Sequence, residues 1–222
     1  MIKIEISEKI NEVCPSIALG CIQGSVKVED INEGLWQTIL KTCGEISEAM
    51  EVADIAKSKN IKDGRSVYRS LGVDPTRYRL SSESLLRRAI KGKDLYQVNN
   101  VVDINNLISI KSMYPICLYD ADKIDDTIYF TVGEAGDTYE GIGRGAFNVE
   151  NFPVFADNNN GKFGSTTSDS EKTMITKETQ EILMILVSFN GDEALEAYVK
   201  ESVELLKKYA DGEALTYHII KK

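Results

Sequence analysis

The residues best suited to ligand chemistry lie between positions 79 and 120, where side-chain amides, a thiol and a phenol follow one another. The thiol of Cys117 and the phenol of Tyr119 alternate with Leu118 on an expected strand. Asparagine amides can cap a helix, and they can also bind the polar edge of a base or an amino acid. The residues alone leave both roles open for the four amides, which belong to Asn99, Asn100, Asn105 and Asn106.

The same region is strongly basic, although the whole chain has a net charge of −9. Between Lys62 and Asp94, nine lysines and arginines stand against four acidic residues. The net charge argues against broad electrostatic binding to nucleic acid, but not against a local basic surface. The cluster is either a solvated helical face with its own ion pairs or a phosphate-binding surface, because guanidinium groups contact phosphate in pairs of hydrogen bonds.

Other chemistries find little support in the sequence. The four cysteines are scattered, and His218 is the only histidine, so we expect no zinc site and no cofactor. The glycine-rich run at 141–146 lacks the lysine and hydroxyl residue of a phosphate-binding loop. The acids of 120–126 lack the glycine and glutamate of a calcium loop. A nucleophilic pair of Cys117 with His218 remains an alternative, although nothing in the sequence places them together.

The elements that must position these residues follow from the hydrophobic pattern. Apolar spacing of three, four and seven predicts helices, alternation predicts strands, and the apolar run 181–189 predicts a buried central strand. Helices are expected at 30–59, 62–71, 81–92, 101–112 and 192–212, and strands at 2–6, 16–28, 116–120, 127–132, 152–157, 181–189 and 216–220. We predict a glycine-rich loop at 134–148 and a turn at 158–165.

Two details of this pattern are specific enough to test. Ser81 or Ser82 is expected to cap the helix of 81–92, which Gly92 would end. Gly20 and Gly24 are expected to mark bulges or points of close approach in the second strand. Because helices dominate the first half and strands the second, residues 1–222 are predicted to form a single α+β domain, a central mixed sheet with helices packed on one face.

The composition and the N-terminal segment also predict the cellular location of the protein. Hydrophobic residues make up 42% and charged residues 27% of the chain, as in an ordinary globular protein. No apolar run reaches about 18 residues, so no membrane association is expected. The charged N-terminus lacks the apolar core of a signal peptide, which makes a cytoplasmic location the expectation.

Five segments in order resemble a known family. They are SSESLLRRAIKGK, NNVVDINNLIS, PICLYDADKI, GEAGDTYEGIG and DNNNGKFGSTTSDSEKT, and the similarity continues through ILMILVSF. Together they resemble the B-three/B-four domain, the editing and tRNA-binding domain of the bacterial phenylalanyl-tRNA synthetase beta chain, most strongly over residues 62–190. The resemblance implies a mixed sheet with flanking helices and a cleft for the 3′ end of a mischarged tRNA. In the family, water hydrolyses the ester in this cleft without a metal.

The resemblance also indicates which site residues have changed. The family's V-V-D-x-T-N stretch is present with Asn105 in place of its threonine, and its P-x-H-x-x-D stretch has Cys117 in place of its histidine. The closing-loop glycine corresponds to Gly141. The family's A-G-x-M-G-G-x-x-S stretch, which carries a functional glutamate, is reduced to GKFGSTTS without one.

We therefore expect an RNA-binding domain of the editing type, a freestanding homologue that does not aminoacylate. Its partner would be tRNA or the 3′ end of an aminoacyl-tRNA. One expectation is that it hydrolyses mischarged aminoacyl-tRNA in trans. The alternative is a module that binds an RNA end or an amino-acid-like metabolite without hydrolysis, which the missing glutamate favours. The pocket candidates are Asn105, Pro115, Cys117, Tyr119 and Gly141, and the phosphate candidates are Arg79, Arg87, Arg88 and Lys91.

Overall fold

The apolar run predicted to be a central strand is an inner strand of a four-stranded antiparallel sheet. In the computed structural model, which describes residues 2–222, β9 (Glu181–Ser188) pairs antiparallel with β2 (Ala18–Ser25) and β3 (Ile116–Asp120). β10 (Glu213–Lys221) extends this sheet beside β2, so the strand order is β10-β2-β9-β3. Every residue of β9 after Glu181 is buried, because the strand has a neighbour on each edge and a layer on each face.

A second four-stranded sheet carries the mixed pairing. Its order is β1-β4-β7-β8, formed by β1 (Lys3–Ile6), β4 (Thr127–Val132), β7 (Pro153–Asp157) and β8 (Gly161–Ser165). β1 and β4 are parallel, and the other neighbours are antiparallel. The predicted α+β class is confirmed. The described strands are divided between two four-stranded sheets and one two-stranded sheet, however, and the sheet around β9 is wholly antiparallel.

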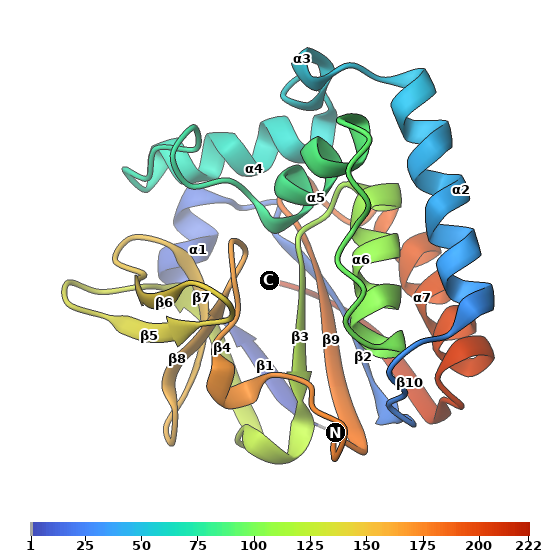
Figure 1. Cartoon of the computed structure of the whole chain (residues 1–222). Coiled ribbons are helices and arrows are strands. Elements are labelled where there is room, and N and C mark those ends of the chain that lie inside the picture. Colours follow the sequence, from blue (N-terminus) through green and yellow to red (C-terminus); the bar gives the residue numbers. More distant parts are fainter. Residues whose placement is uncertain (1) are drawn as a thin grey trace.

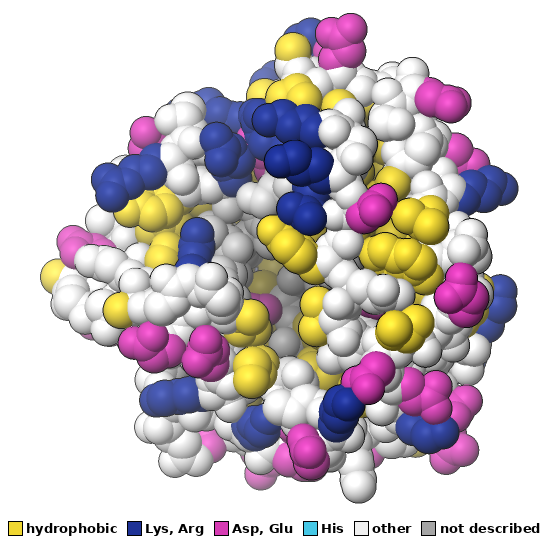
Figure 2. Space-filling view, in the orientation of Figure 1, with side chains coloured by type: hydrophobic (Ala, Val, Ile, Leu, Met, Phe, Trp, Pro, Cys, Tyr) yellow, Lys and Arg dark blue, Asp and Glu magenta, His cyan; other side chains and the backbone are white. Residues whose placement is uncertain are grey.

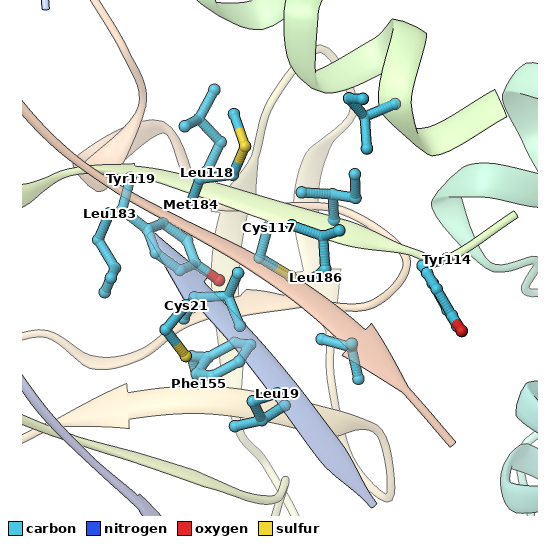
Figure 3. Packing of buried hydrophobic residues seen from close by; sticks show 14 of the residues in the cluster. Leu19, Cys21, Tyr114, Cys117, Leu118, Tyr119, Phe155, Leu183, Met184 and Leu186 are labelled. Atoms are coloured by element: carbon cyan, nitrogen blue, oxygen red, sulfur yellow. The ribbon is translucent and has the colours of Figure 1, made fainter. Parts of the chain in front are cut away.

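The helices cover one face of the antiparallel sheet, and the mixed sheet covers the other (Figure 1). On the helical side lie α2 (Glu33–Ala49), α6 (Asn100–Ser112) and α7 (Leu195–Tyr209). A Cβ at Gly20 would overlap the Val199 side chain, so the glycine lets α7 approach β2 as predicted. On the opposite face, the Tyr119 ring packs edge-on against Phe155 and Phe163, with ring centroids 5.9 and 4.9 Å away (Figure 3).

The remaining helices lie around this core. They are α1 (Glu8–Val13), the short α3 (Val52–Ile55), α4 (Lys59–Ser70) and α5 (Ser81–Ile90). The expected helix of 30–59 is therefore two helices and the start of α4. Gly44 lies inside α2 and does not end it. No helix within residues 2–222 is long and apolar enough to cross a membrane.

Three local predictions were wrong. The loop of 134–148 contains the hairpin β5 (Thr138–Gly141) and β6 (Gly145–Asn148), whose turn uses positive φ at Gly143 and Gly145. The turn of 158–165 contains β8. Neither serine caps α5: the N-cap residue is Leu80, whose apolar side chain cannot accept a hydrogen bond. The Ser82 hydroxyl lies inside the helix and donates to the Met113 carbonyl.

Candidate functional site

A cavity of about 180 Å³ opens between the helical layer and the β5–β6 hairpin. Figure 2 shows this hollow with hydrophobic side chains along its rim. α6, β3, the hairpin turn and the segment between β8 and β9 each contribute to its wall. The lining residues are Val98, Val102, Asn105, Leu118, Ile142, Asp169, Met174 and Ile175.

The asparagines of α6 divide into structural residues and one that faces the cavity. Asn99 caps the helix by accepting a hydrogen bond from the Val102 amide at 2.9 Å. The Asn100 side chain accepts from the Glu29 amide and donates to two backbone carbonyls, which holds the start of α6 against the chain. Asn105 lies further along the helix, and its buried Oδ1 atom has no hydrogen-bond partner. Asn105 is the one asparagine among the residues that line the cavity.

Asp169 is the one acidic residue among the described residues that line the cavity. Its Oδ1 accepts a hydrogen bond from the Tyr119 hydroxyl at 3.0 Å, and its Oδ2 accepts one from the Leu118 amide at 3.3 Å. Burial raises the pKa of Asp169 from 3.8 to about 7, and these two hydrogen bonds partly oppose the rise. Sequence reasoning missed this residue, because it stands in a polar run without periodicity and its partners come from a distant strand.

The five predicted pocket residues are not all at the cavity. Asn105 lines it, and Tyr119 reaches it only through Asp169. Cys117 is 1% exposed and donates a hydrogen bond from its thiol to the Ser165 carbonyl at 3.6 Å, on the face of β3 that meets the mixed sheet. Leu118 is the β3 residue at the cavity, because successive side chains of a strand point to opposite faces (Figure 3).

Pro115 and Gly141 are not among the residues that line the cavity. Pro115 is buried at the start of β3, and its carbonyl accepts a hydrogen bond from the Val187 amide at 3.0 Å. Gly141 is buried at the end of β5, where a Cβ would come within 2.8 Å of the Arg144 side chain. Ile142, the next residue, supplies the wall.

The alternative nucleophilic pair of Cys117 and His218 is excluded by the sheet register. His218 is paired with Cys21, Cys21 with Ile185, and Ile185 with Cys117. Three strand spacings therefore separate the thiol from the imidazole, about 14 Å. Burial also raises the pKa of Cys117 well above its usual range, so the thiol stays protonated.

The predicted phosphate candidates gather on one surface, which we call the basic surface. It is a shallow hollow of about 340 Å³ on α5 and the segment after it. All four candidates contribute to it, together with a further lysine and an aromatic ring. Its residues are Arg79, Ser84, Leu85, Arg87, Arg88, Lys91, Lys93 and Tyr96.

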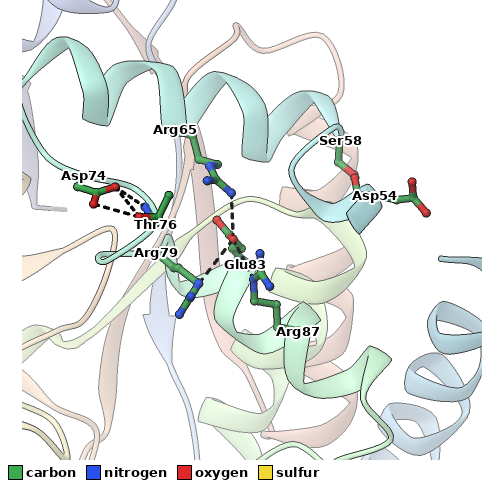
Figure 4. A network of polar contacts seen from close by, with 8 residues as sticks. All are labelled: Asp54, Ser58, Arg65, Asp74, Thr76, Arg79, Glu83 and Arg87. Carbon is green, nitrogen blue, oxygen red and sulfur yellow. Dashed lines mark hydrogen bonds and ion pairs between the residues drawn. The ribbon is translucent and has the colours of Figure 1, made fainter. Parts of the chain in front are cut away.

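Part of this basic charge is neutralised by a single buried carboxylate (Figure 4). Glu83 is fully buried, and one of its oxygens lies 3.0 Å from Arg87 Nε, 3.3 Å from Arg65 Nη1 and 3.9 Å from Arg79 Nε. Three arginines thus share one acid, which leaves an excess of positive charge. Some of the arginines therefore make the ion pairs expected of a solvated helical face, while the surface as a whole stays basic.

The other cations of the basic surface differ in their internal contacts. The Arg88 guanidinium lies 3.9 Å from the centre of the Tyr96 ring and donates a hydrogen bond to the Asp94 carbonyl. Lys91 and Lys93 are exposed, and neither forms an ion pair within residues 2–222. These are the cations that a phosphate could reach without breaking an internal contact.

The basic surface and the cavity are neighbours. Tyr96 belongs to the first and Val98 to the second, and both lie in the segment that joins α5 to α6. Figure 2 shows lysines and arginines gathered along one side of the hollow. Fold and site together define an α+β domain with an apolar cavity that holds one carboxylate beside a basic surface.

A comparison with protein families identifies the family to which this domain belongs. The model of the B3/4 domain matches residues 63–207, so the chain belongs to the B3/4 domain family, as the sequence motifs indicated. Among solved structures, the chain is similar to an N-terminal fragment of the phenylalanyl-tRNA synthetase beta-subunit from Pyrococcus horikoshii. The TM-score is 0.49 and the identity 11%, and the match covers 100% of this chain and 55% of that one. The chain thus spans about half of that fragment. No curated protein matches.

Proposed function

We propose that this B3/4 domain binds the aminoacylated 3′ end of a tRNA, with the aminoacyl group in the cavity and the terminal phosphates on the basic surface. The observation that supports this most directly is the position of the two features side by side on one face. An aminoacyl-tRNA end has the same two parts, a small organic group joined to a string of phosphates. A phosphate-binding surface fixes the position of the nucleic acid, and the adjacent cavity selects what it carries.

RNA binding is tested at the lysines, because they make no internal ion pair. The double variant Lys91→Gln with Lys93→Gln should weaken tRNA binding and reduce the dependence of log affinity on log salt concentration by about 1.4, since each lost contact to single-stranded phosphate removes about 0.7. Lys200→Gln with Lys207→Gln, on α7, removes the same charge outside the basic surface and should leave both quantities unchanged, although these two lysines pair with Glu196 and Glu204. Equal binding by the two double variants would contradict the proposal.

Hydrolysis of the ester in trans is a second candidate function. The orphaned Oδ1 of Asn105 favours it, because that atom can accept a hydrogen bond from a water molecule and orient it toward a carbonyl group in the cavity. In this reaction, water adds to the ester carbonyl carbon, the bond to the ribose oxygen breaks, and the products are a free amino acid and a tRNA with a free terminal hydroxyl.

Deacylation separates hydrolysis from binding alone. The protein is incubated with tyrosyl-tRNA(Phe) and a panel of other mischarged tRNAs, and release of the amino acid is followed over time. Release above background from one member, lost in Asn105→Ala, is the result expected of a hydrolase. Binding without release from any member would contradict hydrolysis and leave a non-catalytic module.

A further inference from the structure

Among residues 2–222, the cavity is lined by one acidic side chain, that of Asp169, and by no lysine, arginine or histidine. Six of its eight lining residues are apolar. An unpaired carboxylate in an apolar surrounding is stabilised by a ligand that brings positive charge or several hydrogen-bond donors. We propose that Asp169 binds the α-ammonium group of an aminoacyl ligand and that the apolar wall takes an aliphatic side chain. This inference rests on the proposed function, because it names the aminoacyl group that the cavity would hold.

The carboxylate of Asp169 is held in place and still has room for a ligand. A carboxylate offers about four lone-pair positions. The Leu118 amide and the Tyr119 hydroxyl occupy two of them and fix the orientation of the group. Asp169 and Asn105 both line the cavity, so a ligand there meets a second side chain that carries an acceptor oxygen. An ammonium group has three hydrogens to donate, whereas the hydroxyl of a tyrosine side chain has only one.

The shape and lining of the cavity favour an aliphatic side chain. Its volume of about 180 Å³ is close to that of an engineered apolar cavity of about 150 Å³ that binds benzene. A side chain of valine, leucine or methionine size fits such a space together with the ammonium group. A tyrosine side chain would compete with the ammonium for the same few acceptors. Branched and thioether side chains form the wall, and these pack well against aliphatic ligands.

No neighbouring charge competes with an ammonium at Asp169. The titratable groups that face it are Tyr119 and Cys117 on β3 and Tyr139 on β5, and burial raises the pKa of each. All three stay neutral near pH 7. Since the pKa of Asp169 is about 7 in the empty cavity, affinity for a cation should increase as the pH rises through 7. It should fall again once the ligand's α-amino group loses its proton, near about 8.

Small ligands test this inference without tRNA. Leucinamide, N-acetyl-leucinamide and tyrosinamide are titrated into the wild-type protein and followed by NMR shifts of Leu118 and Ile142. Leucinamide should bind, and acetylation of its amino group should weaken binding about tenfold or more, because a charge-assisted hydrogen bond is lost. Tyrosinamide should bind more weakly than leucinamide. Acetylation without effect, or tighter binding of tyrosinamide, would overturn the inference.

The variant Asp169→Asn tests whether the carboxylate is responsible for leucinamide binding. Asp169→Asn should lose about tenfold in leucinamide affinity and lose the pH dependence, while Asp122→Asn, at an exposed acid outside the cavity, should match the wild type. The acetylation comparison uses only wild-type protein and holds even if Asp169→Asn folds poorly. tRNA binding is measured in parallel: if tRNA binds but leucinamide does not, the ammonium site is wrong and the proposed function stands. If neither binds, both are wrong.

Discussion

At the scale of single residues, Asp169 makes the stability of the protein depend on pH. Its pKa is raised from 3.8 to about 7 in the folded state, so between these values the folded protein holds a proton that the unfolded chain has lost. Stability should therefore fall as pH rises from about 4 to about 7. The free energy of unfolding, measured in urea, should decrease more between pH 5 and pH 8 for the wild type than for Asp169→Asn. Equal losses would mean that this carboxyl titrates normally.

Gly164 is the residue that leaves space for the contact between Tyr119 and Asp169. A Cβ at this position would overlap the Tyr119 hydroxyl and lie 2.6 Å from Asp169 Oδ1. Gly164→Ala should destabilise the fold by about 1–3 kcal/mol, because the buried side chains must shift. Gly44→Ala is the control, because no atom lies within 4 Å of a Cβ at this position. Alanine in a helix interior should raise the free energy of unfolding by about 0.5–1 kcal/mol. Unfolding midpoints in urea measure both, and a neutral Gly164→Ala would contradict this packing.

At the scale of elements, Glu83 joins α4 to α5. It pairs with Arg65 on α4 and with Arg87 one turn along α5. Glu83→Gln removes the charge that compensates the buried Arg65. Breaking a buried ion pair in this way should lower the free energy of unfolding by about 3 kcal/mol. Arg79→Gln should cost under about 1 kcal/mol, since Arg79 is 43% exposed and 3.9 Å from the acid. Similar losses for both variants, measured by chemical unfolding, would rule out a central role for Glu83.

The elements were largely predictable where a local pattern defines them. The apolar run of β9 and the spacing of α6 correspond to observed elements within a few residues. The hairpin of β5 and β6 was not predictable, because its glycines also suit an open loop. Only the pairing of the two strands across the turn shows that the segment is a sheet. The cavity residues were likewise predictable only where a local sequence motif identifies them. Asn105 was accessible to motif comparison, whereas Asp169 acquires its role from contacts with β3, about 50 positions away in the sequence.

At the scale of the whole molecule, one continuous core joins both sheets and the helices. It extends from Ile39 on α2 through Tyr119 on β3 to Phe155 on β7. We propose that residues 2–222 form one cooperative unit. Trp36 fluorescence, which reports on α2, should then change with the same urea midpoint as the hydrogen exchange of β7 amides. Separate midpoints would indicate that the mixed sheet unfolds on its own and that the single-domain prediction is wrong.

The cavity wall differs from the core in how much mutation it can accept. Val98 is 52% exposed and Ile142 is 46% exposed, and both belong to connecting segments between regular elements. Substitutions there remove little buried surface, so they should change folding by no more than about 0.5 kcal/mol. Evolution, or a library randomised at these two positions, can therefore explore new ligands almost independently of the selection for a folded protein.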